Sequence, residues 1–98
     1  MKKDPNNPSE RDWQRTVVKI ARKHGWLIQE NKFSLYAKPG FPDLVLCRPP
    51  DVIFAELKSN KGKLRPEQED WIENLQACGM RVYVWRPSDE QIVTGYLL

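Results

Sequence analysis

The stretch GFPDLVLCRPPDVIFAELK, residues 40–58, decides the fold because it contains two apolar runs separated by a short break. Residues 44–47 and 52–58 are rich in β-branched and large apolar side chains, which is typical of strands. Residues 48–51 read Arg-Pro-Pro-Asp and stop the first strand, since proline cannot donate a hydrogen bond within a sheet. So short a connection predicts that the two strands pair antiparallel.

On the N-terminal side, this hairpin is preceded by a predicted helix, a strand and a long loop. Ser9 is a helix N-cap, Asp12 completes a variant of the capping box, and Gly25 ends the helix. Between these ends, apolar residues recur at helical spacing, namely Trp13, Val17, Ile20 and Ala21. Residues 26–29 predict a strand, and residues 30–41 predict a long loop or an irregular hairpin.

On the C-terminal side, a polar and basic loop over residues 59–65 leads into a second predicted helix over residues 66–78. Pro66 suits the first helical position, and Gly79 ends the helix. The buried stripe of this helix is expected to comprise Trp71, Ile72, Leu75 and Cys78. Residues 81–85 predict a strand, which the crossover helix allows to lie parallel to the second strand of the hairpin.

The order of predicted elements is α-β-β-β-α-β-α, which indicates an α/β protein with a mixed sheet flanked by helices. Ser88, with Gln91 three residues later, is expected to cap the short last helix. Residues 1–8 hold prolines, asparagines and charges and predict a flexible arm, so that residues 9–98 form a single domain. A chain of 98 residues buries roughly 65% of the surface it exposes when unfolded, which suffices for one core.

The composition is that of a globular protein, with 40% hydrophobic and 30% charged residues. No apolar run approaches the roughly 20 residues of a membrane span, and the N-terminal lysines precede no signal-peptide core. Cys47 and Cys78 are too few for a disulfide framework and are expected to be reduced. These features predict a cytoplasmic protein, either bacterial or, if phage-encoded, in the host cytoplasm. The net charge of +3 is compatible with a polyanionic partner.

Strand alternation predicts where polar side chains meet the core. Glu56 and Lys58 share one face of their strand with Val52 and Phe54, and this face is expected to be covered by a helix. Antiparallel pairing of the hairpin brings Asp43, just before the first strand, beside Glu56. Two half-buried carboxylates repel each other unless a cation lies between them. Because oxygen ligands favour hard cations, the pair predicts a site for Mg²⁺ or Mn²⁺.

The motif Pro42-Asp43, followed after twelve residues by Glu56-Leu57-Lys58, resembles the signature of the PD-(D/E)xK nucleases. Flanking segments carry the resemblance further, namely Ser9-Glu10, Gly25-Trp26, Gly40-Phe41 and Pro66-Glu67-Gln68. Over residues 9–87 the chain resembles the VRR-NUC (virus-type replication-repair nuclease) family. Arg65 departs from the family pattern, in which a small capping residue more often precedes the proline. The resemblance implies a restriction-endonuclease-like fold with an α-β-β-β-α-β core and a short C-terminal helix.

The resemblance also implies roles for individual residues. The implied metal ligands are Asp43, Glu56, Glu10 and the backbone carbonyl of Leu57. The implied catalytic residues are Asp43, Glu56, Lys58, Gln68 and Glu10. Lys58 would contact the attacking water or the scissile phosphate. The implied activity is Mg²⁺- or Mn²⁺-dependent hydrolysis of phosphodiester bonds in DNA, without an organic cofactor.

Small stand-alone VRR-NUC proteins are similar to Holliday-junction resolvases, so the resemblance implies a homodimer that cuts branched DNA such as four-way junctions. A two-fold dimer matches the two symmetric cuts that a four-way junction requires. Residues 30–41 and the C-terminal segment 92–98 are the expected dimer contacts.

Several alternatives stay open. Lys61, Lys63 and Arg65 follow the motif and are expected to bind DNA phosphates, although such a run can also be a solvated loop. Glu10 and Gln68 can equally be first-turn residues with a structural role in their helices. For the whole chain, the alternatives are a flap, nicking or restriction-type nuclease, or a catalytically inactive nucleic-acid-binding module.

Overall fold

The computed structural model describes residues 7–31 and 36–98. Three α-helices, one 3-10 turn and four strands follow one another in this part of the chain: α1 (Glu10–Lys23), β1 (Leu27–Glu30), β2 (Leu44–Arg48), β3 (Asp51–Leu57), α2 (Pro66–Ala77), β4 (Arg81–Trp85), η1 (Pro87–Asp89) and α3 (Glu90–Leu97). This is the predicted α-β-β-β-α-β-α order. No helix within the described residues combines the length and apolar character needed to cross a bilayer.

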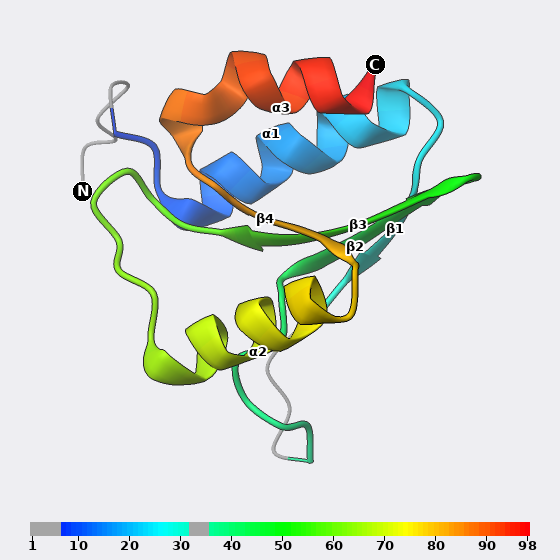
Figure 1. Ribbon diagram of the computed structural model, residues 1–98. Helices are drawn as coiled ribbons and strands as arrows, with labels where there is room; N and C mark the ends of the chain where they lie inside the picture. Colours follow the sequence, from blue (N-terminus) through cyan, green and yellow to red (C-terminus); the bar gives the residue numbers. More distant parts are fainter. Residues whose placement is uncertain (1–6, 32–35) are drawn as a thin grey trace.

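The four strands form one mixed sheet in the order β1-β2-β3-β4. The first three strands pair antiparallel, and β4 pairs parallel with β3 after the α2 crossover. Figure 1 shows α1 and α3 against one face of the sheet and α2 against the other. The prediction of a mixed sheet between helices is therefore confirmed.

The main core lies between the sheet and the α1 and α3 helices. Ser9 caps α1, since its hydroxyl oxygen accepts a hydrogen bond of 3.1 Å from the amide of Asp12. The buried side chains of this core include Trp13, Val17, Val18 and Ala21 from α1, Ile53, Ala55 and Leu57 from β3, and Val93 and Leu97 from α3. Alternate residues of β3 therefore face this core, and the intervening residues face α2.

Arg48, at the end of β2, ties the C-terminal ends of two helices together. Its guanidinium donates hydrogen bonds to the backbone oxygens of His24, Leu97 and Leu98, at 2.8, 3.2 and 2.9 Å. The same group lies 4.4 Å from the centre of the Trp26 ring, whose indole N–H also donates to Leu97. These contacts fix α3 against α1.

Three expectations about individual residues are wrong. Cys78 is exposed because α2 ends at Ala77 and Cys78 forms the turn beyond it. Val52 is 40% exposed, since it lies beside the hairpin turn at the end of β3 distant from Glu56. Ser88 does not cap α3. It lies within the 3-10 turn, and its amide donates to the side chain of Asn60 at 3.0 Å.

Two predicted segments lie partly outside the described residues. These are residues 1–6 of the predicted arm and residues 32–35 of the predicted loop. Asn7 and Pro8, the last residues of the predicted arm, are partly buried, and the side chain of Asn7 lies beside that of Asn60.

Candidate active site

Strand register brings three polar residues together at one end of the sheet. Leu44 pairs with Ala55, so Asp43 stands opposite Glu56 just beyond the β2–β3 ladder. The Oδ2 atom of Asp43 accepts a hydrogen bond of 2.8 Å from the backbone amide of Leu57. This bond fixes the Asp43 side chain against the end of β3, next to Glu56.

Asn31 is the third residue in this row, and it was not among the predicted site residues. Its amide donates to the backbone oxygen of Asp43 at 2.8 Å, and its side-chain Nδ2 donates to the backbone oxygen of Pro42 at 2.9 Å. Asn31 therefore positions the segment that carries Asp43. The signal available in the sequence was weak, namely its place shortly after the first predicted strand, because its position opposite Asp43 depends on the observed register of β1 with β2.

Glu56 is a buried carboxylate, with a side chain only 1% exposed. Its Oε1 atom accepts a hydrogen bond of 3.1 Å from Nε2 of Gln68, and no described donor reaches its buried Oε2 atom. Burial, followed by the negative charge of Asp43, raises the pKa of Glu56 to about 8, while the positive charge of Lys58 acts in the opposite sense. The metal-free site therefore favours a protonated Glu56, which can share its proton with Asp43.

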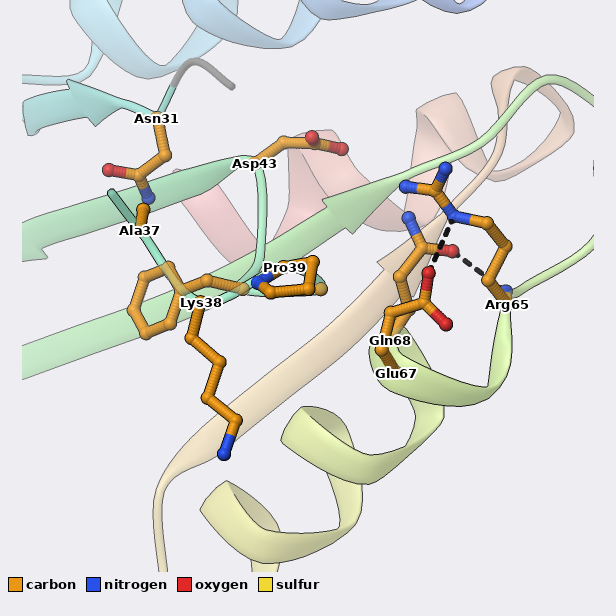
Figure 2. Close-up of a pocket in the computed structure, with 10 residues that line it drawn as sticks. Asn31, Ala37, Lys38, Pro39, Asp43, Arg65, Glu67 and Gln68 are labelled. Carbon is orange, nitrogen blue, oxygen red and sulfur yellow. Dashed lines mark hydrogen bonds and ion pairs between the residues drawn. The ribbon is translucent and has the colours of Figure 1, made fainter. Parts of the chain in front are cut away.

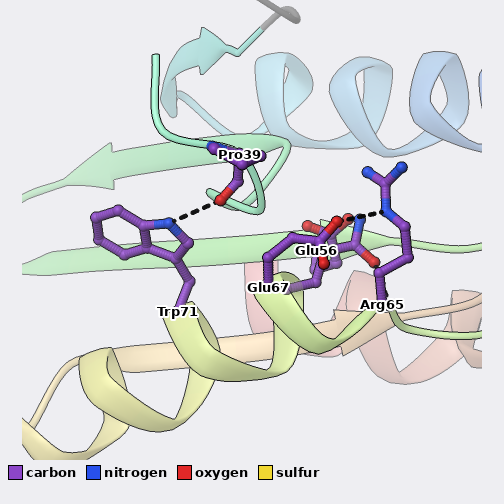
Figure 3. A network of polar contacts seen from close by, with 6 residues as sticks. Pro39, Glu56, Arg65, Glu67 and Trp71 are labelled. Carbon is purple, nitrogen blue, oxygen red and sulfur yellow. Dashed lines mark hydrogen bonds and ion pairs between the residues drawn. The ribbon is translucent and has the colours of Figure 1, made fainter.

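Gln68 links this carboxylate to the start of α2. Its Oε1 atom accepts a hydrogen bond of 2.9 Å from the backbone amide of Arg65, the residue before Pro66. This bond leaves Nε2 free to point at Glu56, so the helix start determines the orientation of the side-chain amide. The Arg65 side chain makes no capping bond and instead pairs with Glu67 at 3.3 Å (Figures 2 and 3).

Lys58 follows β3 directly and is only 8% exposed. Its amide donates to the backbone oxygen of Trp85 at 3.1 Å, which extends the parallel pairing with β4 by one residue. The loop after Lys58 is held in place by Arg86, whose guanidinium donates to the backbone oxygens of Ser59 and Gly62, both at 2.6 Å. The positive charge of Lys58 thus lies close enough to Glu56 to affect the pKa of that carboxyl.

Glu10 lies further out than the other predicted site residues. It is exposed in the first turn of α1, and its negative charge raises the pKa of Glu56 less than burial and Asp43 do. Among the described residues, no group of three or more His, Cys, Asp and Glu side chains is arranged to hold a metal ion. The structure therefore places Asp43 and Glu56 together, but it does not place Glu10 in a preformed cluster with them.

A groove of about 380 Å³ opens beside Asp43 and Gln68. Figure 2 shows Asn31 and Asp43 on one side of it, Arg65 and Gln68 on the other, and Lys38 at its edge. Of the three predicted DNA-binding residues, only Arg65 lines this groove, whereas Lys61 and Lys63 are exposed on the preceding loop.

The two walls of the groove are joined. The indole N–H of Trp71 in α2 donates to the backbone oxygen of Pro39 at 3.2 Å (Figure 3). The Phe41 ring packs edge-to-face on Trp71, with ring centres 5.0 Å apart. Gly40 has a φ of +95°, and a Cβ atom there would collide with the backbone carbonyl of Glu67. Glycine at this position therefore allows the loop to pack directly on the first turn of α2.

The donor set fits a hard divalent cation. Two adjacent carboxylates, one of them buried with an oxygen that no described donor reaches, form an unfavourable arrangement unless a positive charge binds there. Carboxylate oxygens are ligands that Mg²⁺ and Mn²⁺ prefer. The described residues that would hold such an ion are Asp43 and Glu56.

The described fold is thus a mixed sheet between helices, with paired carboxylates where β2 begins and β3 ends. The model of the VRR-NUC domain family matches residues 8–89, and the chain belongs to this family. A solved structure described as a VRR_NUC domain is 25% identical, with a TM-score of 0.72 over 85% of this chain and 88% of that chain. A comparison with curated proteins gives no match. The resemblance inferred from the sequence is confirmed.

The raised pKa of Glu56 predicts a pH-dependent stability of the metal-free protein. Between its ordinary pKa of 4.5 and about 8, the folded state binds a proton that the unfolded state has lost. The free energy of unfolding should therefore fall as the pH rises through this range, by at most about 1.4 kcal/mol per pH unit. Glu56→Gln should abolish this dependence, as measured by urea unfolding in EDTA. Parallel pH profiles for both proteins would contradict the prediction.

The packing of Gly40 predicts that alanine lowers the free energy of unfolding by unequal amounts at the three glycines with positive φ. Gly25 and Gly79 both have φ of +81° and open space around a Cβ atom, so alanine there should cost about 1–2 kcal/mol of backbone strain. Gly40→Ala should cost more, because it adds a backbone collision to similar strain. Urea unfolding of the three variants measures the difference, and equal costs would show that the loop does not pack on α2.

Proposed function

We propose that this chain is a metal-dependent endonuclease that hydrolyses phosphodiester bonds in DNA. The observation that carries the proposal is the Asp43–Glu56 carboxylate pair, in which no donor among the described residues reaches the buried Oε2 atom of Glu56. The pair lies beside a groove with the cationic side chains of Lys38 and Arg65 at its margin, which suits a phosphate backbone. Membership of the VRR-NUC family supports the same reaction class.

In this proposal, Asp43 and Glu56 bind Mg²⁺ or Mn²⁺, the Leu57 carbonyl adds a further oxygen, and Glu10 contributes a carboxylate from α1. Such an ion polarises a phosphoryl oxygen and lowers the pKa of a bound water. Gln68 acts as a positioning residue, because its Nε2 atom holds Oε1 of Glu56 and leaves Oε2 for the ion.

Lys58 supplies a fixed positive charge at the same end of β3. Most of the Lys58 residue is buried, so its ammonium is held at the end of β3, where a positive charge can attract a phosphate or a water-derived hydroxide. In the proposed reaction, Lys58 orients the attacking water or contacts the scissile phosphate. Lys61, Lys63 and Arg65, on the segment that follows, bind neighbouring phosphates.

The proposed substrate is branched DNA, and the proposed active form is a homodimer. One carboxylate pair cuts one strand, whereas a four-way junction requires two symmetric cuts. Exposed apolar side chains on and after α3, Ile92, Tyr96 and Leu98, support a contact between two copies. A flap or nicking nuclease is the second candidate within the same reaction class, and the intact Asp43, Glu56 and Lys58 set disfavours an inactive binding module.

Cleavage of DNA should require Mg²⁺ or Mn²⁺ and should be lost in Asp43→Asn and Glu56→Gln. Each substitution removes a charged oxygen ligand at nearly constant volume. Lys58→Ala should lower turnover by at least about 100-fold, the lower end of effects for a group that acts in the chemical step. The measurement is cleavage of labelled DNA, with metal binding followed by calorimetry.

Glu73→Gln on the exposed side of α2 makes the same chemical change as Glu56→Gln and serves as the control. It should cleave like the wild type. Loss of activity in Glu56→Gln should occur without loss of folding, which circular dichroism checks. Full cleavage in EDTA would refute the proposed metal dependence.

The protein should be a dimer in solution and should cut a four-way junction in preference to a linear duplex of the same sequence. Light scattering should give about twice the 11.5 kDa mass of the chain at micromolar concentration. Ile92→Glu should produce a monomer, whereas Leu27→Glu, at an exposed apolar residue of β1, should not. A monomeric wild type, or equal cleavage of junction and duplex, would refute the resolvase assignment and leave the nuclease assignment in place.

A further inference from the structure

A row of four cationic side chains lies along the outer side of α1. Arg11, Arg15, Lys19 and Arg22 follow one another at intervals of four, four and three residues, so they lie within an arc of about 80° on the helix. All four are exposed. Asp12 pairs with Arg15 at 3.7 Å, a surface contact of small energetic value. This row has no part in the core or in the candidate active site described above.

The cationic row borders two adjoining hollows. One, of about 520 Å³, is lined by Glu10, Arg11, Gln14, Arg15 and Glu30. The other, of about 350 Å³, is lined by Arg15, Val18, Lys19, Arg22 and Glu30. Because Arg15 and Glu30 line both hollows, they form one shallow trough between α1 and the end of β1. We call this surface the α1 trough.

One end of the α1 trough lies near the candidate active site. Glu10, at one end of it, lies close enough to raise the pKa of Glu56. Glu30, on its other wall, is followed directly by Asn31, which lines the groove beside Asp43. A polymer that lies in the trough can therefore continue into the candidate active site.

The charge and length of the α1 trough fit a phosphodiester backbone. Four cations face two carboxylates, and one of these, Glu30, accepts a hydrogen bond of 3.0 Å from Gln14. From Arg11 to Arg22 the helix rises by about 16 Å, at 1.5 Å per residue. One strand of a duplex carries a phosphate every 3.4 Å of axis, so about four or five phosphates cover this length.

We propose that the α1 trough binds the DNA backbone on one side of the cleavage site, with Lys19 and Arg22 contacting phosphates several nucleotides from the scissile bond. This inference rests on the proposed nuclease function and extends it. It assigns a second contact surface to the substrate and implies a minimum length of DNA beyond the cut.

A matched pair of lysines on α1 tests the proposal. Lys19 and Lys23 are both exposed, but only Lys19 lines the trough. Duplex binding is measured by fluorescence anisotropy in EDTA over a range of salt concentrations. Lys19→Gln should reduce the slope of log K against log salt by about 0.9, the value for one lost phosphate contact. Lys23→Gln should leave the slope unchanged.

A triple substitution of Arg15, Lys19 and Arg22 by Gln should weaken binding of a long duplex at least tenfold and leave that of a duplex too short to reach the trough unchanged. An unchanged salt slope in the triple variant, or equal losses for Lys19→Gln and Lys23→Gln, would overturn the proposal. If one of these results is found and the wild type still cleaves DNA, the α1 trough proposal fails and the proposed nuclease function stands. If the wild type neither binds nor cleaves DNA, the proposed function itself has failed.

Discussion

The burial of the Glu56 carboxylate beside Asp43 is the constraint on which the candidate site depends. The hydrophobic interior of a domain tolerates a buried acid only if the acid stays protonated or gains a compensating charge. Here the neighbouring residues compensate the carboxylate only in part. Gln68 donates to one oxygen, and no described donor reaches the other. The positive charge of Lys58 lowers the pKa of Glu56, but burial and Asp43 still raise it to about 8. The fold therefore holds an unfavourable electrostatic arrangement in a rigid place, which is typical of a site that is completed by a ligand.

The pairing register of the sheet strands supplies much of that rigidity. Asn31, just after β1, and Asp43, just before β2, lie in register with Glu56 of β3. The Asn31 amide donates to the backbone oxygen of Asp43, and the Leu57 amide donates to the Asp43 side chain. The crossover helix α2 then adds Gln68 from the face of the sheet opposite to α1 and α3 (Figure 1).

Much of this arrangement could be predicted from the sequence, because it follows from strand alternation and from one short turn. The pairing of Asp43 with Glu56 needs only the antiparallel hairpin. The role of Asn31 could not be found in the same way, since it depends on the register of β1, whose predicted bounds were one residue off. Gly40 and Arg86 act through contacts with segments more than 20 residues away, which no local pattern reveals. Cys78 and Ser88 were misplaced because helix ends depend on tertiary packing.

The contact of Gly40 with α2 has a consequence for how any substrate is accommodated. A loop that packs backbone against backbone on a helix cannot swing outward without loss of that contact, so the contact opposes widening of the groove. In the proposed nuclease, much of the adaptation would then come from the DNA. Smooth bending of a 20–30 base-pair duplex by 40–90° costs of order 1–6 kcal/mol, and that cost differs between one DNA shape and another. Selectivity can therefore arise from the stiffness of the substrate rather than from any movement of the protein.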